Sequence, residues 1–300
     1  MKTCSLALYD AFTEVAFGGS QAAIITGAAS IEPQQRQLIA REIGMPATAF
    51  VDAYGADWIK LQFMSTVMEL PMCGHGTLCL LTHMLESGLM QFAGHNIELR
   101  LPKSTANVSL SKTASGRFQV MLDITPPRFE AAPPHSGELL DLLGLDAAAL
   151  STELPLETAR GDFIHLVVPL AGLAQMRAIR PDFSGMVQFC HAYGLETIAV
   201  FCLQTEDPAR QLHVRDFCPA VGVSESAAAG TTNAALTSYL LRHSRVTIDG
   251  TGFTVDAEQG IELGRPSSIK SRVTLDNAGG IARLQVGGIA TRVFAGQIFL

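Results

Sequence analysis

Two side chains with catalytic chemistry lie immediately before a stretch with the pattern of an apolar helix. Cys73 and His75 flank Gly74, and the helix is expected from about Thr77 to Leu89, closed by Gly88. A thiol at a helix start is expected to have a lowered pKa, so that its thiolate is available as a base. His75 could pair with it or donate to a substrate oxygen. The alternative is a small buried cysteine beside a turn histidine.

A second loop of small residues, Ser224–Gly230, runs into a second apolar helix, expected over Thr231–His243. The first N–H groups of a helix lack partners within the helix and carry partial positive charge. Two such helix starts facing one cleft could hold a carboxylate without any lysine or arginine. Gly74, Gly76 and Gly230 would let the backbone approach a ligand closely, unless they merely form tight turns.

The two helix starts belong to an internal repeat. Gly74 lies 156 residues before Gly230, and Leu80 lies the same distance before Leu236. Proline-rich segments at 125–127 and 131–134 lie between the two copies and form the best linker candidate. The sequence therefore predicts two halves of similar design.

Hydrophobic periodicity predicts the elements that position these residues. In the first half, Ile31–Ile43 has helical periodicity, with Leu38, Ile39 and Ile43 on one face. Strands are expected there at Cys4–Tyr9, Ala49–Asp52, Trp58–Met64, Ile97–Leu101, Ala106–Leu110 and Arg117–Leu122, and Ala22–Thr26 is an apolar run. The second half is expected to have further helices at Gly137–Leu145 and Pro181–Tyr193, and strands at Phe163–Pro169, Thr197–Leu203 and Gln211–Phe217, with more strands at the end.

The composition is that of a globular protein with one large or two medium domains: 300 residues, 48% hydrophobic and 16% charged. A net charge of −7 disfavours nucleic acid and anionic membranes as partners. No apolar run reaches 18 residues, and the first residues do not have the pattern of a signal peptide. Six scattered cysteines form no CxxC pair, which disfavours a metal site and favours free thiols in a reducing cytoplasm.

Several blocks of the sequence resemble the PhzF-like isomerases of phenazine biosynthesis, and they follow the family's order along nearly the whole chain. The blocks are Asp10–Thr13 with Phe17–Gly19 and Ala22-Ala23, Ile39–Glu42 with Thr48–Val51, Glu69–Thr77, Gln259-Gly260 with Gly264–Ser267, and Val286–Gly288 through to Leu300. The central block is also similar to the loop of proline racemases, which have the same diaminopimelate-epimerase-like fold.

The resemblance implies an α+β fold with two pseudo-symmetric lobes, each a curved mixed β-sheet, or half-open barrel, around a central helix. The last strands would return to the first lobe, so that residues 1–124 plus 285–300 form the first lobe and 125–284 the second. It also implies an active site between the lobes, no metal, no cofactor and a homodimer. Members of the family isomerise or epimerise small carboxylates by taking a proton next to a carboxyl or imine group.

The catalytic pattern of the PhzF-like isomerases survives only in part. His75 matches the family's histidine, but Ala47 stands where the family carries its glutamate base. In the second loop, Ser226 stands where an aspartate would follow Glu225, and Thr231 replaces a serine. Diaminopimelate epimerases and proline racemases instead use two cysteines. Cys73 matches the first of these, but the second position holds Ala229.

Racemisation needs a base on one face of the substrate and an acid on the other, and the second loop offers no obvious candidate. A process with one base is therefore favoured: an isomerisation that moves a proton on a small carboxylate. The expected catalytic residues are Cys73, His75 and Thr231, and the expected substrate-binding residues are Ser20, Gly74, Gly76, Ser226, Gly230 and Thr232.

Two other functions compete with this one: a dehydratase or epimerase of an amino or hydroxy acid such as hydroxyproline, and an inactive family member that only binds a ligand. Among individual residues, Glu225 could replace the missing carboxylate, but a solvated loop residue is the commoner role. His213 and Asp216 flank Arg215 in a predicted strand, where polar packing or a solvent face is favoured over catalysis. Arg265 could bind substrate or form a turn beside Pro266.

Overall fold

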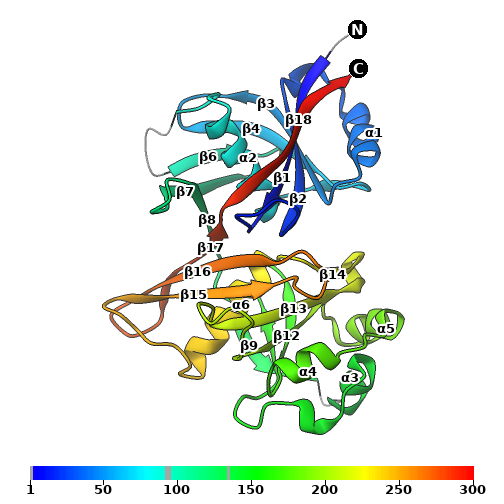
Figure 1. Ribbon diagram of the computed structural model, residues 1–300, viewed down its shortest axis with the longest axis vertical. Coiled ribbons are helices and arrows are strands. Elements are labelled where there is room, and N and C mark those ends of the chain that lie inside the picture. The colour runs from blue at the N-terminus through cyan, green and yellow to red at the C-terminus, as the bar shows by residue number, and fades with distance from the viewer. Residues whose placement is uncertain (1–2, 92–95, 134–135) are drawn as a thin grey trace. The chain divides into compact units, whose positions relative to one another are not determined.

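The computed structural model describes residues 3–91, 96–133 and 136–300, and the chain divides into two compact units (Figure 1). The first unit comprises Met1–Asp123 and Gly287–Leu300, and the second comprises Ile124–Val286. Each unit combines β-strands with helices, and this confirms the predicted α+β class. Whether these units are independently folding lobes with the predicted bounds stays a prediction.

A curved sheet forms most of the first unit. Its strands are β1 (Thr3–Ala11), β2 (Ser20–Thr26), β3 (Ala47–Tyr54), β4 (Trp58–Met64), β5 (Glu69–Leu70), β6 (Asn96–Arg100), β7 (Thr105–Lys112), β8 (Phe118–Ile124) and β18 (Ala290–Phe299). The C-terminal strand β18 pairs antiparallel with β1 along its length, and Figure 1 shows the two side by side in red and blue. β2 and β3 are parallel neighbours, as are β4 and β6, and the other pairs are antiparallel.

Helix α2 (Gly74–Glu86) is the buried centre of the first unit. Every residue from Gly76 to Leu85 is buried, including the polar Thr77, Thr82 and His83, so the helix is enclosed on all sides. The predicted start at Thr77 is wrong by three residues, because Cys73 caps the helix and Gly74 to Gly76 already form its first turn. The helix ends at Glu86 rather than at the predicted Leu89, and Gly88, with a φ of 71°, follows its C-terminal end.

Helix α1 (Pro33–Ile43) packs outside the sheet, with Ile39 and Ala40 against Phe50 of β3. Of the predicted face, Ile39 is buried and Ile43 packs against the same core, but Leu38 is 62% exposed.

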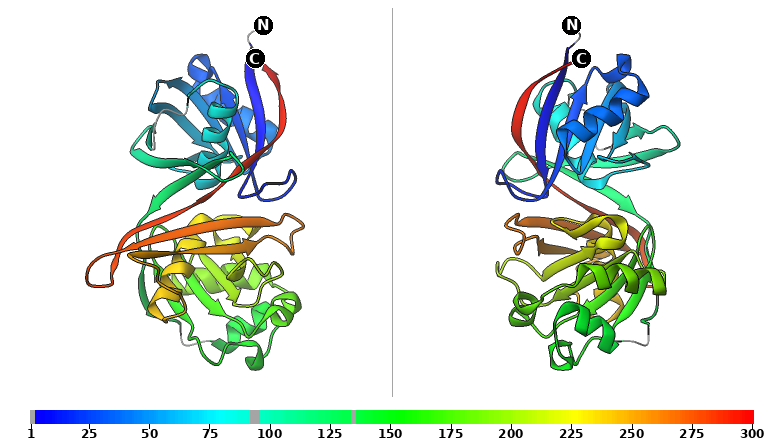
Figure 2. Two further views of the ribbon diagram at one scale, coloured as in Figure 1. Left: turned by 60° about the vertical axis from the view of Figure 1, so that its left-hand side comes forward. Right: turned by 90° about the vertical axis from the view of Figure 1, so that its right-hand side faces the viewer.

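The second unit repeats the plan of a sheet around a helix, here α6 (Gly230–Arg242), whose residues 232–240 are buried. Its strands are β9 (Arg128–Ala131), β10 (Glu157–Arg160), β11 (Ile164–Pro169), β12 (Thr197–Cys202), β13 (Leu212–Cys218), β14 (Val223–Ser226), β15 (Gly252–Gln259), β16 (Ser267–Leu275) and β17 (Ile281–Gly288). The remaining helices are α3 (Ser136–Leu143), α4 (Leu173–Ala178) and α5 (Phe183–Tyr193). α3 and α5 share a core with β12, and Figure 2 shows them together in green at one side of the unit.

The two units have the same order of elements around their central helices. In each, an outer helix ends at a glycine with positive φ, Gly44 after α1 and Gly194 after α5. A strand follows that pairs parallel with the strand before the helix, β3 with β2 and β12 with β11. An antiparallel strand comes next, β4 or β13, and then the loop to the central helix. This order confirms the prediction of two halves of similar design.

The proline-rich segment between the halves is not a simple linker. β9 follows Pro127 and pairs with β10, so this part of the segment belongs to the sheet of the second unit. Prolines 126 and 127 themselves precede the strand, where they remove no hydrogen bond of the ladder. Pro134, at the end of the predicted linker, lies outside the described residues.

Candidate functional site

The start of α2 brings Cys73 and His75 together. The Cys73 Sγ lies 3.6 Å from both ring nitrogens of His75 and accepts a hydrogen bond from the backbone N–H of Gly76 at 3.4 Å. The Thr77 hydroxyl donates to the Cys73 carbonyl at 2.8 Å and fixes the cap from the other side. The sequence therefore placed these two side chains correctly next to each other at a helix start.

The prediction of a lowered pKa for Cys73 is wrong. Burial raises the pKa of its thiol to about 12, and the hydrogen bond from Gly76 offsets only part of this effect. Burial also lowers the pKa of His75 to about 4. Both groups are therefore neutral near pH 7, a thiol beside an imidazole rather than an ion pair.

The two glycines of this helix start differ in their surroundings. A Cβ on Gly76 would lie 2.8 Å from a ring carbon of Phe63 and 3.0 Å from the Cys73 Sγ, so the protein's own packing requires glycine there. A Cβ on Gly74 would meet no atom within 4 Å, and Gly74 is exposed. Open space at Gly74 leaves room for a ligand near the first N–H groups of α2.

Two other predicted positions of the first unit lie at the beginnings of strands. Ser20 begins β2 and is half-buried, and Ala47 begins β3 and is fully buried. Thr48, the neighbour of Ala47, is also fully buried, and its hydroxyl has no hydrogen-bond partner among the described residues. No hydrogen bond in the described part of the chain joins Ser20 to Cys73 or His75.

The start of α6 lacks a side-chain cap. Ala229 is its N-cap residue and has no group that could accept from the first turn. Gly230 and Thr231 are half-buried, whereas Thr232 is fully buried and its hydroxyl lies near the buried carboxyl of Asp216. The first N–H groups of α6 can therefore serve an anion, but the Thr232 side chain is inside the unit.

A residue that the sequence did not single out as functional, Gln259, holds the loop before α6. Its side chain is fully buried; Oε1 accepts from the N–H of Ala229 at 3.3 Å and from the Asn233 amide at 2.8 Å, and Nε2 donates to the Ser226 carbonyl at 2.8 Å. The Ser267 hydroxyl donates to the Ala227 carbonyl at 2.6 Å. The resemblance contained both Gln259 and Ser267, but only as a motif without a role.

Glu225 has neither of the roles considered for it. Its side chain is 5% exposed and accepts two hydrogen bonds from Arg215, from Nε and Nη2, each at 2.8 Å. A carboxylate that neutralises a buried arginine is not available as a catalytic base. Glu225 is therefore a structural partner of Arg215 and not a solvated loop residue.

His213 and Asp216 are both buried in β13. His213 lies between two carboxylates, with Nδ1 2.7 Å from Glu258 and Nε2 2.9 Å from Glu262. Asp216 is 2% exposed and lies opposite Ser226 in the ladder between β13 and β14. Neither side chain therefore faces the solvent, which was one of the two roles expected for them.

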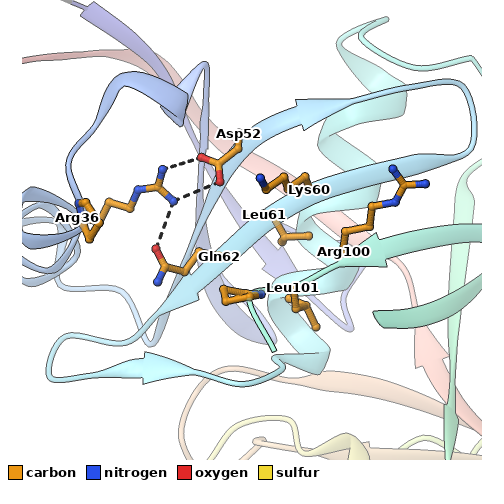
Figure 3. A pocket seen from close by; sticks show the side chains of 9 residues that line it. Arg36, Asp52, Lys60, Leu61, Gln62, Arg100 and Leu101 are labelled. Carbon is orange, nitrogen blue, oxygen red and sulfur yellow. Dashed lines mark hydrogen bonds and ion pairs between the residues drawn. The ribbon is translucent and has the colours of Figure 1, made fainter. Parts of the chain in front are cut away.

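A pocket of ≈ 620 Å³ in the first unit contains none of the predicted site residues (Figure 3). Arg36, Asp52, Lys60, Gln62 and Arg100 supply its polar lining. The Arg36 guanidinium forms an ion pair with the Asp52 carboxylate at 2.6 Å and donates a hydrogen bond to the Gln62 side-chain oxygen at 3.2 Å. Because neighbouring residues of a strand point to opposite faces, Gln62 lies on the face of β4 away from Phe63 and the start of α2.

Comparisons with known proteins identify the family of the chain and several relatives. A model of the PhzC-PhzF family, described as phenazine biosynthesis-like proteins, matches residues 9–296. The chain is 26% identical over 270 residues to an uncharacterised isomerase, YddE, of Escherichia coli O157:H7, covering 89% of each chain. It is 27% identical to the trans-2,3-dihydro-3-hydroxyanthranilate isomerase of Pseudomonas fluorescens, covering 98% of each chain.

Solved structures support the fold. A phenazine biosynthesis protein of the PhzF family from Bacillus anthracis superimposes with a TM-score of 0.91 at 23% identity, covering 100% of both chains. A hydroxyproline epimerase from Agrobacterium vitis superimposes with a TM-score of 0.57 at 13% identity, covering 99% of this chain and 92% of that one. The predicted fold is therefore confirmed, and the names of the sequence relatives support the predicted enzyme class, an isomerase.

Proposed function

Because the chain belongs to the PhzC-PhzF family of phenazine biosynthesis-like proteins, we propose that it is an isomerase that moves a proton on a small carboxylate-bearing substrate without a cofactor. The named isomerases among its relatives support the reaction class, since each aligns with about nine-tenths or more of the chain. The substrate of the Pseudomonas fluorescens relative, a cyclic unsaturated amino acid, is a reasonable first test compound.

The observation that carries the proposal is the helix start in each unit. α2 begins after Cys73 and carries His75 in its first turn, and α6 begins after Ala229 without a side-chain cap. Backbone N–H groups and the helix dipole at such a start favour a negatively charged ligand. Neither first turn contains a lysine or arginine, so the backbone itself would supply the attraction for a substrate carboxylate.

We assign catalytic roles to Cys73, His75 and Thr231. Since Cys73 and His75 are neutral near pH 7, they suit hydrogen bonding to the negative charge that develops when a C–H bond breaks. They are poorly suited to taking the proton themselves. The proposed substrate-binding residues are Ser20, Gly74, Gly76, Ser226, Gly230 and Thr232, with the buried Thr232 acting through its backbone.

Deuterium exchange tests the proposal. The protein is incubated in D₂O with trans-2,3-dihydro-3-hydroxyanthranilate and with a panel of amino, hydroxy and unsaturated carboxylic acids, and each is followed by NMR. We expect an isomerised product from at least one unsaturated acid. C73A and H75Q should lower the rate by about 10²-fold or more, the range for a lost donor to a developing charge, whereas C73S keeps a donor and should be less affected.

Matched controls separate the alternatives. H191Q changes an exposed histidine at the end of α5 and should leave the rate unchanged. Loss of water from a hydroxyproline would favour the dehydratase. Epimerisation by two thiols is not expected, because Ala229 has no titratable side chain. Thermal stabilisation by panel members without any exchange would contradict the isomerase and favour a protein that only binds carboxylates.

A further inference from the structure

Asp216, in strand β13 of the second unit, is a buried carboxyl group that apolar packing alone does not explain. It is 2% exposed, and its Oδ1 has no hydrogen-bond partner among the described residues. Buried polar atoms in folded proteins are nearly always paired, because an unpaired one costs about 1–3 kcal/mol. The unpaired Oδ1 of Asp216 is therefore a feature whose surroundings need to be considered in full.

The strand pattern directs Asp216 toward the start of α6. Its neighbours Arg215 and Phe217 face the opposite side, where Arg215 donates to the Met176 carbonyl and Phe217 joins the core of α3 and α5. Asp216 points the other way, because successive side chains alternate. The hydroxyls of Thr232, in the first turn of α6, and Thr197, at the start of β12, lie close enough to affect its ionisation.

Asp216 also lies directly beside the loop that leads into α6. It is the cross-strand partner of Ser226, and cross-strand partners have Cβ atoms about 4.5–5.5 Å apart on one face of the sheet. Gln259 fixes both Ser226 and Ala229 at the two ends of this loop. The carboxyl thus lies beside the loop before the uncapped start of α6, and hydrogen bonds from Gln259 hold that loop.

We propose that Asp216 is the catalytic acid–base group of the second unit, which takes a proton from the bound carboxylate substrate and returns it to another carbon. The proposal rests on the proposed function, since the substrate must bind at the start of α6. The substrate C–H bond breaks as the Asp216 O–H bond forms, and the electron pair moves into the conjugated system. The O–H bond then breaks as the new C–H bond forms, so that atoms and electrons balance without an oxidant or co-reactant.

The protonation behaviour of Asp216 suits this role better than that of Cys73 or His75. Burial raises the pKa of Asp216 to about 7, the hydroxyls of Thr232 and Thr197 lower it, and the charge of Glu225 raises it. Both its forms are therefore populated near neutral pH, as proton transfer in both directions requires. A carboxyl at this position is thus able to act as base and then as acid within one turnover.

Other charged or titratable groups around Asp216 are accounted for. Glu225 of β14 is neutralised by Arg215. Cys218, two residues along β13, has a pKa raised by burial and by Asp216 itself, so it stays a thiol. The His165 Nδ1 of β11 lies 2.7 Å from the Thr197 hydroxyl. Burial lowers the pKa of His165 to about 4, so its ring is neutral near pH 7. The first turn of α6 contains no acidic residue.

The test compares the pH dependence of deuterium exchange in the wild type, D216N and D216E, with the substrate that the panel identifies. We expect kcat/KM of the wild type to rise with an apparent pKa near 7. D216N should lose about 10²–10⁴-fold and become flat with pH, and D216E should retain activity with a shifted profile. D249N, which changes an exposed aspartate, is the matched control and should resemble the wild type.

The outcomes distinguish this inference from the proposed function. An active wild type together with a folded D216N of equal rate and pH profile overturns the role of Asp216 and leaves the isomerase standing. A wild type that exchanges no panel compound overturns both. If D216N fails to fold, D216E decides the matter, because an unchanged pH profile in that variant excludes Asp216 as the titrating group.

Discussion

The side chain of Cys73 occupies a space that depends on the absence of a side chain at position 76. Phe63 and the Cys73 thiol both approach Gly76 so closely that a Cβ there would overlap them. The same contacts bury the thiol, and burial in turn raises its pKa. One glycine therefore links the packing of α2 to the protonation state of the residue proposed to act at its start.

The substitution G76A should destabilise the protein by about 1–3 kcal/mol, the usual effect of overpacking a core. G74A is the matched control, because its Cβ has open space. Alanine should leave stability there unchanged or raise it by up to ~1 kcal/mol. Urea unfolding followed by circular dichroism measures both, and equal effects at the two positions would contradict the packing argument.

Alkylation of Cys73 should be slow near neutral pH and should still be rising above pH 10, since burial raises the pKa of its thiol to about 12. Peptide mapping by mass spectrometry after timed exposure to iodoacetamide measures its reactivity, with C73S identifying the peptide. A reaction that reaches its plateau below pH 8 would show a stabilised thiolate and would restore the role of Cys73 as a base.

At the scale of elements, the loop before α6 is fixed by contacts from strands β15 and β16, which follow it in the chain. Gln259 makes three hydrogen bonds that join Ser226, Ala229 and Asn233. Ser267 adds a fourth contact to the same loop. The start of α6 therefore depends on residues more than 25 positions away in the sequence.

Q259A should remove the partners of three polar groups at once. We expect a loss of roughly 2–4 kcal/mol in the free energy of unfolding, because each buried polar group left unpaired costs about 1–3 kcal/mol and water entering the space offsets part of it. Q35A changes an exposed glutamine at the start of α1 and should change stability little. A Q259A variant as stable as Q35A would show that the loop is held by other contacts.

The pairing of His213 with Glu258 and Glu262 predicts a specific dependence of stability on pH. Burial lowers the pKa of His213, but the hydrogen bonds and charges of Glu262 and Glu258 outweigh it, so that the pKa is raised. A histidine with a raised pKa in the folded state stabilises it fully below the unfolded pKa of about 6.5. This stabilisation is lost as the pH rises through the folded value.

The stability difference between the wild type and H213Q should therefore be largest near pH 6 and smaller at pH 9. Urea unfolding at both pH values measures it. H191Q, an exposed histidine on α5, should show no such change. A difference that grows with pH would mean that His213 is neutral in the folded protein.

The sequence could predict elements with strong local patterns but not partners that the fold brings together. The strands β6, β7 and β8 could be predicted from their alternating apolar and polar residues, and α2 could be predicted from its run of apolar residues. The true start of α2 could not be predicted, because Gly74-His75-Gly76 has poor helix propensity and is held by the Cys73 cap and by Phe63. At this helix start, buried contacts outweigh the low helix propensity of the local sequence.

The same distinction applies to the candidate site residues: contacts between sequence neighbours could be predicted, whereas contacts made by strand pairing could not. Cys73 and His75 are close in sequence, and their contact could be predicted from spacing. Glu225 looked like a loop residue because its partner Arg215 meets it only when β13 and β14 pair. Asp216 looked like ordinary polar packing for the same reason, since nothing local shows that it faces a helix start 14 residues later.

At the scale of the whole molecule, the chain leaves the first unit after β8 and returns to it with β18. The second unit is continuous, whereas the first depends on both ends of the chain. None of the helices in the described ranges is long and apolar enough to span a membrane. The predicted homodimer and cytoplasmic location stay predictions.

A chain that stops after Gly288 should lose stability mainly in the first unit, because β1 loses its antiparallel partner along its whole length. Hydrogen exchange measured by mass spectrometry should show loss of protection in β1 and β2, with protection in β12 and α6 retained. Equal loss in both units would contradict the prediction that they are separate folding lobes.

The pairing of β18 with β1 has a consequence for synthesis on the ribosome. β1 is made before the whole second unit, yet one of its edges stays open until β18 emerges. The second unit is complete before that moment, because its last residue, Val286, precedes β18. The half of the protein that is made first is therefore finished last, and for most of synthesis a nascent chain exposes an unpaired strand edge, the kind of surface on which chaperones and aggregation compete.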